Sequence, residues 1–237
     1  MLEAIERGND LPTGTVYLTE DQTAGRGQGN NRWHSTAGAN LTLSLLLRPD
    51  HLSVDRLFVL TQVASLAVHD AVRDHLPGSL APGVRIKWPN DLYVEDRKLA
   101  GILIQNGLRG NRINWSVVGT GLNVNEAAFP PELEQAATSL YLLTGKPVER
   151  GEVLKRYFDH ITQWHKLLAE ENYPEIDREY QQRLYRRGET VAFLDLEKNE
   201  RFTATVRGTD AMGRLQLRRS DGNEESYELR SLRWLLR

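Results

Sequence analysis

The sequence of 237 residues suits one domain of α/β size, or such a domain with a small appendage. Its 30 basic and 32 acidic residues leave a formal net charge of −2, which provides no overall attraction to DNA or to an anionic membrane. The sequence has no cysteine, which excludes disulfides and thiolate zinc sites and fits a cytoplasmic protein. Neither a signal peptide nor a membrane-spanning apolar run is expected.

The first half of the chain combines short strands with one long helix. Residues 2–7 have the pattern of a helix end, and residues 15–19 carry the β-branched and aromatic side chains of a strand. Leucines dominate residues 40–47, which indicates a buried strand. Apolar side chains recur at helical spacing over residues 53–75, so we expect an amphipathic helix there.

Strands joined by tight turns follow this helix. They are predicted over residues 84–87, 91–94, 98–105 and 113–118, with turns at 88–90 and 95–97. Because these connections are too short for crossover helices, the pattern predicts a mixed or antiparallel sheet rather than a doubly wound parallel one. The expected fold class is therefore α+β.

The C-terminal part changes character near residue 187. Residues 130–140 are loop-like, and helices are expected over residues 150–170 and 173–185. Four short strands follow over residues 190–194, 201–207, 214–217 and 226–229, a spacing typical of a small β-barrel. We therefore predict a larger domain over residues 1–186 and a barrel domain over residues 187–237.

Residues 23–33, Thr-Ala-Gly-Arg-Gly-Gln-Gly-Asn-Asn-Arg-Trp, have the composition of an anion-binding loop. Closely spaced glycines remove side chains where the main chain must approach a ligand. Arg26 lies between two of them and Arg32 adds a second cation, so both are candidates for binding a phosphate or a carboxylate. No Gly-Lys-Ser/Thr follows, which excludes a P-loop. An ordinary glycine-rich surface loop is the alternative.

Three further segments carry polar groups suited to an anionic ligand. Residues 87–91, Lys-Trp-Pro-Asn-Asp, combine a cation, an aromatic ring, a turn and two acceptor side chains. Lys98 begins a strand in which Gly101 allows a ligand to lie against the main chain. Asn123 and Asn125 are spaced so that both side chains would point the same way in an extended chain and bind the edge of a base. Each lysine taken singly is more often a solvated surface charge.

Several cations without a histidine cluster or a serine nucleophile motif suit the stabilisation of developing negative charge. Activation of a carboxylate by ATP fits, because the carboxylate must attack an anionic α-phosphate. Two unit charges about 4 Å apart repel by roughly 4 kcal/mol at an effective dielectric constant near 20. A lysine or arginine between them offsets this repulsion, which amounts to about a thousandfold in rate. Mg²⁺ is expected with ATP, with ligands that the sequence does not assign.

With these four segments in this order, the sequence resembles the biotin protein ligases, or biotin–[acetyl-CoA-carboxylase] ligases. The segments are residues 24–33, 87–91, 98–103 and 119–125, and the resemblance covers nearly the whole chain. It implies a class II synthetase-like fold, in which helices back a mixed β-sheet, with a small SH3-like β-barrel at the C-terminus.

The resemblance also implies activation of biotin by ATP to biotinyl-5′-AMP, followed by transfer to one lysine of a biotin carboxyl carrier protein, part of acetyl-CoA carboxylase or a related carboxylase. Lys98 would bridge the biotin carboxylate and the α-phosphate, so Lys98 and Arg26 are the expected catalytic residues. The residues implied to contact biotin are Gln22, Gly25, Arg26, Gly27, Gln28, Lys98 and Gly101. Those implied to contact the nucleotide are Arg32, Trp33, Lys87, Asn90, Asp91, Asn123 and Asn125.

The sequence departs from the family pattern in two respects. The family opens with a strand and a Ser-Thr-Asn motif that lines the biotin pocket, whereas this sequence begins inside the helix that follows. Gln28 stands where many members have arginine, so one cation that retains the adenylate is absent. We expect easier release of free biotinyl-AMP by the wild type than by Gln28→Arg.

Three other readings remain open from the sequence. A lipoate or octanoate ligase shares the architecture and the adenylate chemistry. A non-catalytic biotin- or nucleotide-binding module, or a structural interaction protein, would lack the adenylate chemistry. No helix-turn-helix precedes the ligase motifs, so the sequence favours the monofunctional type without DNA binding, as a monomer or a homodimer.

Overall fold

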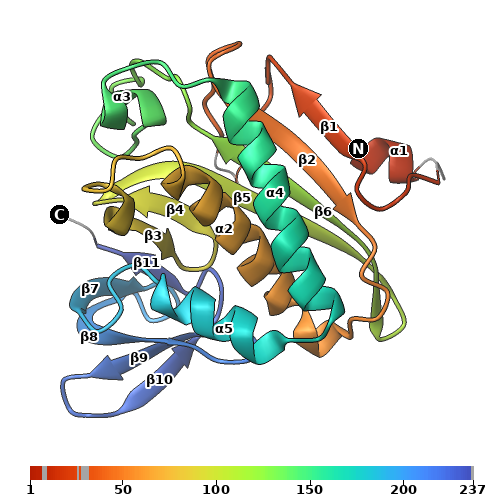
Figure 1. The fold of residues 1–237 in the computed structure, drawn as a ribbon. Coiled ribbons are helices and arrows are strands. Elements are labelled where there is room, and N and C mark those ends of the chain that lie inside the picture. Colours follow the sequence, from red (N-terminus) through yellow and green to blue (C-terminus); the bar gives the residue numbers. More distant parts are fainter. Residues whose placement is uncertain (7–9, 26, 28–31, 236–237) are drawn as a thin grey trace.

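The structure, a computed structural model, describes residues 1–6, 10–25, 27 and 32–235. It contains two β-sheets, with helices packed against the larger one (Figure 1). The larger sheet has the strand order β1-β2-β6-β5-β4-β3. Its strands are β1 Val16–Thr19, β2 Leu41–Leu47, β3 Val84–Lys87, β4 Asp91–Val94, β5 Arg97–Arg109 and β6 Arg112–Leu122.

All neighbouring strands of the larger sheet pair antiparallel, while the isolated bridges from Ile86 to Leu184 and from Lys98 to Ala137 are parallel. The strands predicted over residues 98–105 and 113–118 are parts of one long hairpin, β5 and β6. In that hairpin Gly101 and Gly121 are register partners on adjacent strands. Two bare main-chain positions therefore lie side by side in the middle of the sheet.

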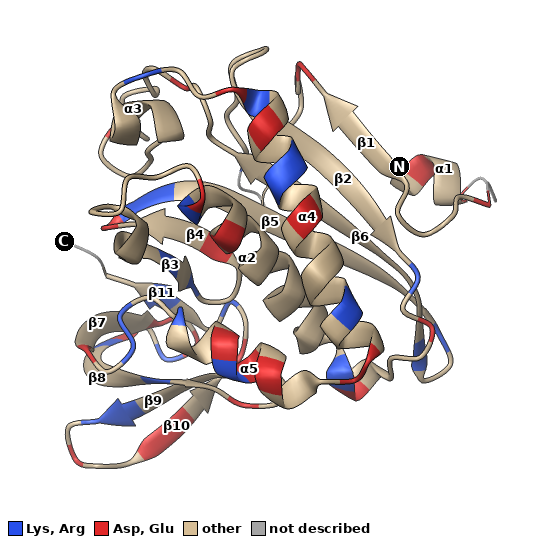
Figure 2. Ribbon diagram, viewed as in Figure 1, with Lys and Arg blue, Asp and Glu red and all other residues tan. Residues whose placement is uncertain are grey.

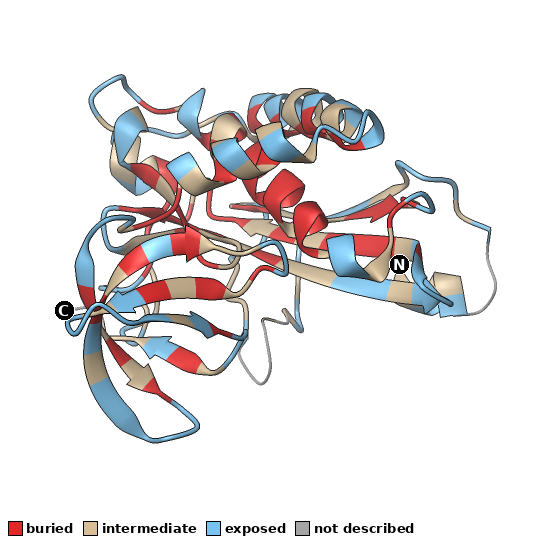
Figure 3. Ribbon diagram, turned by 90° about the horizontal axis from the view of Figure 1, so that it is seen from below, coloured by how far each residue is buried: buried red, intermediate tan, exposed pale blue. Residues whose placement is uncertain are grey.

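Helices cover one face of this sheet. They are α2 Phe58–Arg73, which a short 3₁₀ turn at Val54–Arg56 precedes, and α4 Arg150–Ala169, α5 Tyr173–Gln182 and the short α3 Leu140–Thr144. Helix α2 is buried along most of its length, and buried residues gather between the helices and the sheet (Figure 3). Basic and acidic residues are interspersed along α4 and α5 (Figure 2). Short helix α1, Leu2–Glu6, lies near β1 and the N-terminus.

The smaller sheet has the order β10-β9-β8-β7-β11. Its strands are β7 Thr190–Asp195, β8 Glu200–Thr209, β9 Leu215–Arg219, β10 Glu224–Tyr227 and β11 Leu232–Trp234. In the described part of the chain β10 and β11 are the two edges of this sheet, so the predicted small SH3-like barrel consists of five strands and does not close. Both edge strands are very short, which leaves few main-chain groups to join them. The sequence pattern missed β11.

Buried contacts fix the smaller sheet against the larger unit. The indole Nε1 of Trp88 donates to the carbonyl of Gly213 at 2.8 Å. The amide of Gln181 donates to the carbonyl of Thr209 at 3.1 Å. The segment 87–91 is therefore held from both units, whereas the domain boundary near residue 187 stays a prediction. Among the described residues, no helix combines the length and apolarity needed to cross a membrane.

Candidate active site

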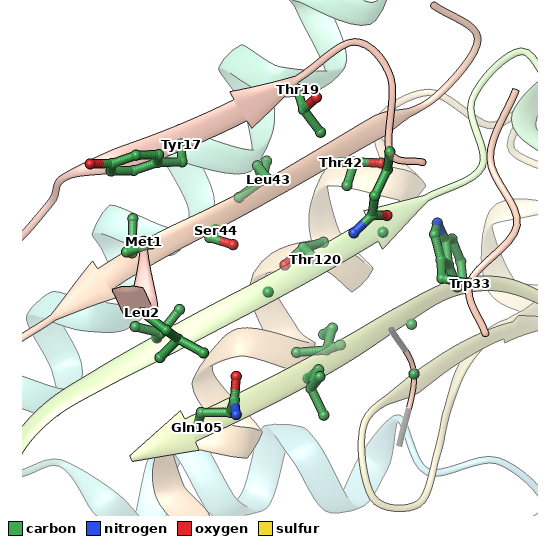
Figure 4. A pocket seen from close by; sticks show the side chains of 18 of the residues that line it. Met1, Leu2, Tyr17, Thr19, Trp33, Thr42, Leu43, Ser44, Gln105 and Thr120 are labelled. Atoms are coloured by element: carbon green, nitrogen blue, oxygen red, sulfur yellow. The ribbon is translucent and has the colours of Figure 1, made fainter. Parts of the chain in front are cut away.

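The face of the larger sheet turned away from α2 and α4 is the floor of a cavity of about 580 Å³. Side chains alternate along a strand, so Leu41 and Leu45 of β2 pack in the core while Thr42 and Ser44 line the cavity. The cavity is a trough along β5 and β6, with Trp33 at one end and Gln105 at the other (Figure 4). Most of the predicted site residues lie at the Trp33 end.

Lys98 is the second residue of β5 and lines this end of the trough. Its ammonium donates to Oδ2 of Asp91 at 2.7 Å, and both side chains are about 30% exposed (31% and 30%). The main chain of Lys98 is held from both sides, since its N–H donates to Ala136 at 2.8 Å and its carbonyl accepts from Thr138 at 2.9 Å. The ammonium is thus fixed in position, only partly screened by water, and neutralised by a single carboxylate.

Trp33 lies across the two register-paired glycines. A Cβ on Gly121 would meet Trp33 Cε2 at 2.4 Å, and a Cβ on Gly101 would meet Trp33 Cζ3 at 3.1 Å. The indole therefore requires glycine on β6, because any other side chain would displace it. The Lys98 ammonium lies 5.8 Å from the centroid of the indole. Trp33 Nε1 is buried without a hydrogen-bond partner among the described residues, which leaves a donor free at this end of the trough.

The described part of the glycine-rich loop lies against the trough. Gln22, Gly27 and Arg32 line it, and the Oε1 of Gln22 is a second buried atom without a described partner. The two ends of the loop meet where the N–H of Trp33 donates to the carbonyl of Gly25 at 3.1 Å. A Cβ on Gly25 would lie 2.4 Å from the Trp33 carbonyl, so this crossing also requires glycine. Arg26 and Gln28, both predicted site residues, lie outside the described residues.

The segment 87–91 divides between two environments. Asn90 and Asp91 line the trough, and Asn90 Nδ2 donates to the carbonyl of Ile102 at 2.9 Å. Lys87 is not among the lining residues. Its ammonium lies 4.7 Å from the ring centroid of Tyr93 and 5.9 Å from that of Trp234, on β11. Burial lowers the pKa of Lys87 to about 8, opposed by the charge of Asp91 and assisted by that of Lys98.

Asn123 and Asn125 follow the end of β6 and do not line the trough. Asn123 Nδ2 donates to the carbonyl of Thr138 at 3.0 Å, and its Oδ1 is buried without a described partner. Asn125 uses both ends of its amide on Val148, donating to the carbonyl and accepting from the N–H, each at 2.8 Å. The two amides therefore join neighbouring loops, because the chain leaves the strand at Leu122.

Sequence reasoning missed the far part of the trough. Its lining there includes Tyr17, Ser44, Gln105 and Val117, and Thr42, also missed, lies nearer the Trp33 end. Thr42 and Ser44 were detectable, since they interrupt a run of leucines at alternating positions and must face away from the core. Tyr17 and Gln105 carry no comparable signal, because their place depends on how four strands pair.

The fold is that of the biotin protein ligases. The structure is similar to "Biotin protein ligase from Aquifex aeolicus in complex with biotin and ATP", with a TM-score of 0.77, 28% identity, and coverage of 95% of this chain and 91% of that chain. The model of the Biotin/lipoate A/B protein ligase family matches residues 3–123. The chain belongs to this family.

Curated relatives agree with this membership. The "Biotin--[acetyl-CoA-carboxylase] ligase" of Mycobacterium tuberculosis is 32% identical over 221 residues, covering 92% of this chain and 77% of the relative. The "Bifunctional ligase/repressor BirA" of Bacillus spizizenii is 36% identical over 166 residues, covering 65% of this chain and 49% of the relative. The match thus spans about half the length of that relative.

Proposed function

We propose that this protein activates biotin with ATP to biotinyl-5′-AMP and transfers the biotinyl group to a lysine of a biotin carboxyl carrier protein, part of acetyl-CoA carboxylase or a related carboxylase. One observation carries the proposal. The Lys98 ammonium is held against Asp91 at 2.7 Å, beside the indole of Trp33 and above the bare main chain of Gly101, at the end of a trough open to a ligand. Family membership supports the same reading.

The first step brings two anions together. A carboxylate oxygen of biotin forms a bond to the α-phosphorus of ATP, and the bond from that phosphorus to the pyrophosphate oxygen breaks. Lys98, placed between the two anions, offsets their repulsion and the charge that develops on the phosphoryl oxygens. Asp91 keeps the ammonium in place before the ligands arrive, since the contact of 2.7 Å fixes the end of an otherwise flexible side chain.

The second step forms an amide. The neutral ε-amine of the carrier lysine attacks the acyl carbon, the bond from that carbon to the AMP oxygen breaks, and the amine loses its proton to the surrounding water. A trough that is open along one side suits an acceptor lysine that enters from another protein. Charge on the leaving AMP is again near Lys98.

We assign proposed roles to the other predicted residues from their positions relative to the trough. Gln22, Gly25, Gly27 and Gly101 lie in or beside the trough and would contact biotin, together with Arg26 and Gln28 of the same loop. Arg32, Trp33, Asn90 and Asp91 line the Lys98 end and would contact the nucleotide. Lys87, Asn123 and Asn125 would act from outside the lining, and both asparagines would have to give up main-chain hydrogen bonds to bind a base directly.

Mg²⁺ would accompany ATP and neutralise charge on the pyrophosphate. The described residues contain no group of three His, Cys, Asp or Glu side chains able to hold a metal ion, so phosphate oxygens and water would supply most ligands. This fits the usual manner in which proteins bind Mg²⁺ with a nucleotide. Cytoplasmic location, a monomeric or dimeric state and the absence of DNA binding remain parts of the proposal.

Formation of the adenylate tests the proposal directly. The protein is mixed with ATP, Mg²⁺ and biotin, lipoate or octanoate in parallel, and release of pyrophosphate and of the acyl-AMP is measured. We expect both products with biotin and neither with the other two acids. A carrier domain is then added, and its mass is expected to rise by one biotinyl group. Adenylate formed only from lipoate or octanoate would assign the related activity, and binding of biotin without pyrophosphate would indicate a non-catalytic module.

A further inference from the structure

Glu126 is a buried carboxylate that no step of the proposed reaction uses. It is 4% exposed and follows directly after the asparagines at the end of β6. Three hydrogen bonds reach its two oxygens, from the N–H of Thr36 at 3.0 Å, the hydroxyl of Thr36 at 2.5 Å and Nδ2 of Asn40 at 2.7 Å. Burial alone would raise its pKa, but these hydrogen bonds hold the pKa of the carboxyl below its usual value. Glu126 is therefore an anion with its oxygens well occupied.

All three donors come from one short segment, residues 36–40, which connects the glycine-rich loop to β2. The same segment has main-chain links to both sides. Asn125 N–H donates to the carbonyl of Ala39 at 2.9 Å, and Gly38 N–H donates to the carbonyl of Glu20 at 2.8 Å. These links and the Asn40 contact with Glu126 hold the far end of the segment, whereas the two bonds from Thr36 to Glu126 hold its near end, three residues from Trp33. His34, between them, lies 3.9 Å from the carboxylate.

We propose that Glu126 is a positioning residue for Trp33. By bonding both the N–H and the hydroxyl of Thr36, it fixes the chain just after Trp33 and so holds the indole over Gly101 and Gly121 beside Lys98. The role of Trp33 in substrate binding rests on the proposed function, whereas its position over the two glycines is given by the structure. A carboxylate suits this task because charge-assisted hydrogen bonds to main chain are stronger than neutral ones.

The contacts separate this role from support of the sheet. The ladder between β2 and β6 starts at Leu41 and Leu122 and does not involve the Glu126 side chain. The link from Ser139 to this residue uses the Glu126 carbonyl, which every substitution retains. Loss of the carboxylate is therefore expected to free residues 33–36 and to leave the sheet paired.

The first test reads the position of Trp33 without any ligand. Hydrogen exchange of the Trp33 amide, which donates to Gly25 and not to Glu126, is followed by NMR in the wild type, Glu126→Gln and Thr36→Val. We expect exchange about tenfold faster in Glu126→Gln and a smaller increase in Thr36→Val, which removes one of the three hydrogen bonds. Unchanged exchange at Trp33 would overturn the proposal, and it can do so even in a protein that makes no adenylate.

Asp195 provides a matched control. It is a carboxylate that is 3% exposed and accepts from the N–H groups of Glu197 and Lys198 at 3.0 Å each, in the smaller sheet. Asp195→Asn is expected to lower the thermal midpoint to a similar extent while exchange at Trp33 stays at the wild-type rate. Equal acceleration in both variants would mean that Trp33 responds to general loss of stability, and this too would overturn the proposal.

The second test asks whether Glu126 acts through Trp33. The kcat/KM for biotinyl-AMP formation is measured for the wild type, Glu126→Gln, Trp33→Ala and the double variant. In the protein that keeps Trp33, we expect Glu126→Gln to lower kcat/KM about tenfold. In the Trp33→Ala background, the same substitution is expected to lower kcat/KM by less than about twofold. A tenfold loss in both backgrounds would show independent roles and contradict the proposal. If the wild type forms no adenylate, the proposed function fails and the exchange test alone decides on Glu126.

Discussion

Lys98 and Lys87 lie on either side of Asp91, yet the structure gives them opposite surroundings. Lys98 contacts Asp91 at 2.7 Å and faces the trough with about a third of its side chain exposed (31%). Lys87 lies against Tyr93 and Trp234, between the two sheets, with its ammonium 3.2 Å from the Tyr93 hydroxyl. Burial lowers the pKa of Lys87 to about 8.

The comparison shows which surroundings allow a lysine to take part in the reaction. Both lysines feel the charge of Asp91, but only Lys98 combines a fixed ammonium with access to a ligand. Lys87 is instead covered by a strand of the smaller sheet, so its charge acts from outside the lining of the trough, on Asp91 and on Lys98. We therefore expect Lys98 to affect the rate of adenylate formation and Lys87 to affect mainly the stability of the contact between the sheets.

The most direct test of this difference between the two lysines is to remove each ammonium in turn. Lys98→Met is expected to lower kcat for adenylate formation about a thousandfold, because the repulsion between two anions is no longer offset. Lys87→Met is expected to lower it about tenfold or less, since the loss acts through Asp91. Pyrophosphate release at saturating biotin and ATP measures both values.

Lys155→Met serves as the control for these variants. Lys155 also pairs with a carboxylate, Asp159 at 3.3 Å, but on the outer face of α4. Wild-type kcat is expected for it. Similar losses in Lys98→Met and Lys87→Met would mean that the two lysines act together on the substrates, and the comparison would then be wrong.

Gly121→Ala tests whether the reaction depends on the position of Trp33 over Gly101 and Gly121. Its Cβ would lie 2.4 Å from the Trp33 ring, so the indole must move away from the glycine pair. We expect kcat/KM for adenylate formation to fall by about tenfold to a hundredfold with little change in the stability of the sheet. Gly78→Ala, where nothing lies within 4 Å of the added Cβ, is the control. Full activity in Gly121→Ala would show that the position of Trp33 does not matter for the reaction.

The sequence predicted the individual helices and strands better than it predicted how the strands pair into sheets. Helical spacing located α2 and α4, and short turns correctly favoured an antiparallel arrangement over a doubly wound one. The edge strand β11 was missed because Leu232–Trp234 is too short to show alternation. Strand spacing predicted the small barrel but did not say whether its edges meet, and in the structure β10 and β11 are the two edges of an open sheet.

The candidate site divides in the same way. Residue type and spacing brought Lys98, Asp91, Gly101 and Trp33 together correctly as neighbours. The same reasoning treated Asn123 and Asn125 as one extended pair, although each amide bonds a different loop. It also gave no sign of Glu126, because a single glutamate after a strand becomes informative only when Thr36, 90 residues earlier in the chain, is seen beside it.

The smallest effect, and the most specific to Lys87, is on the pH dependence of stability. The pKa of Lys87 is about 8 in the folded protein, below the value of about 10.4 expected for an unfolded chain. Between these values the unfolded chain binds more protons, so the free energy of unfolding rises with pH, and the cost of the buried charge is fully present below about pH 8. Urea denaturation of the wild type and of Lys87→Met, between about pH 7.5 and about pH 9, measures the difference while staying below the range of tyrosine ionisation. We expect the wild type to gain about 1 kcal/mol relative to the variant over this range. A constant difference would mean that Lys87 titrates at its ordinary value, and that Tyr93 and Trp234 do not keep water from it.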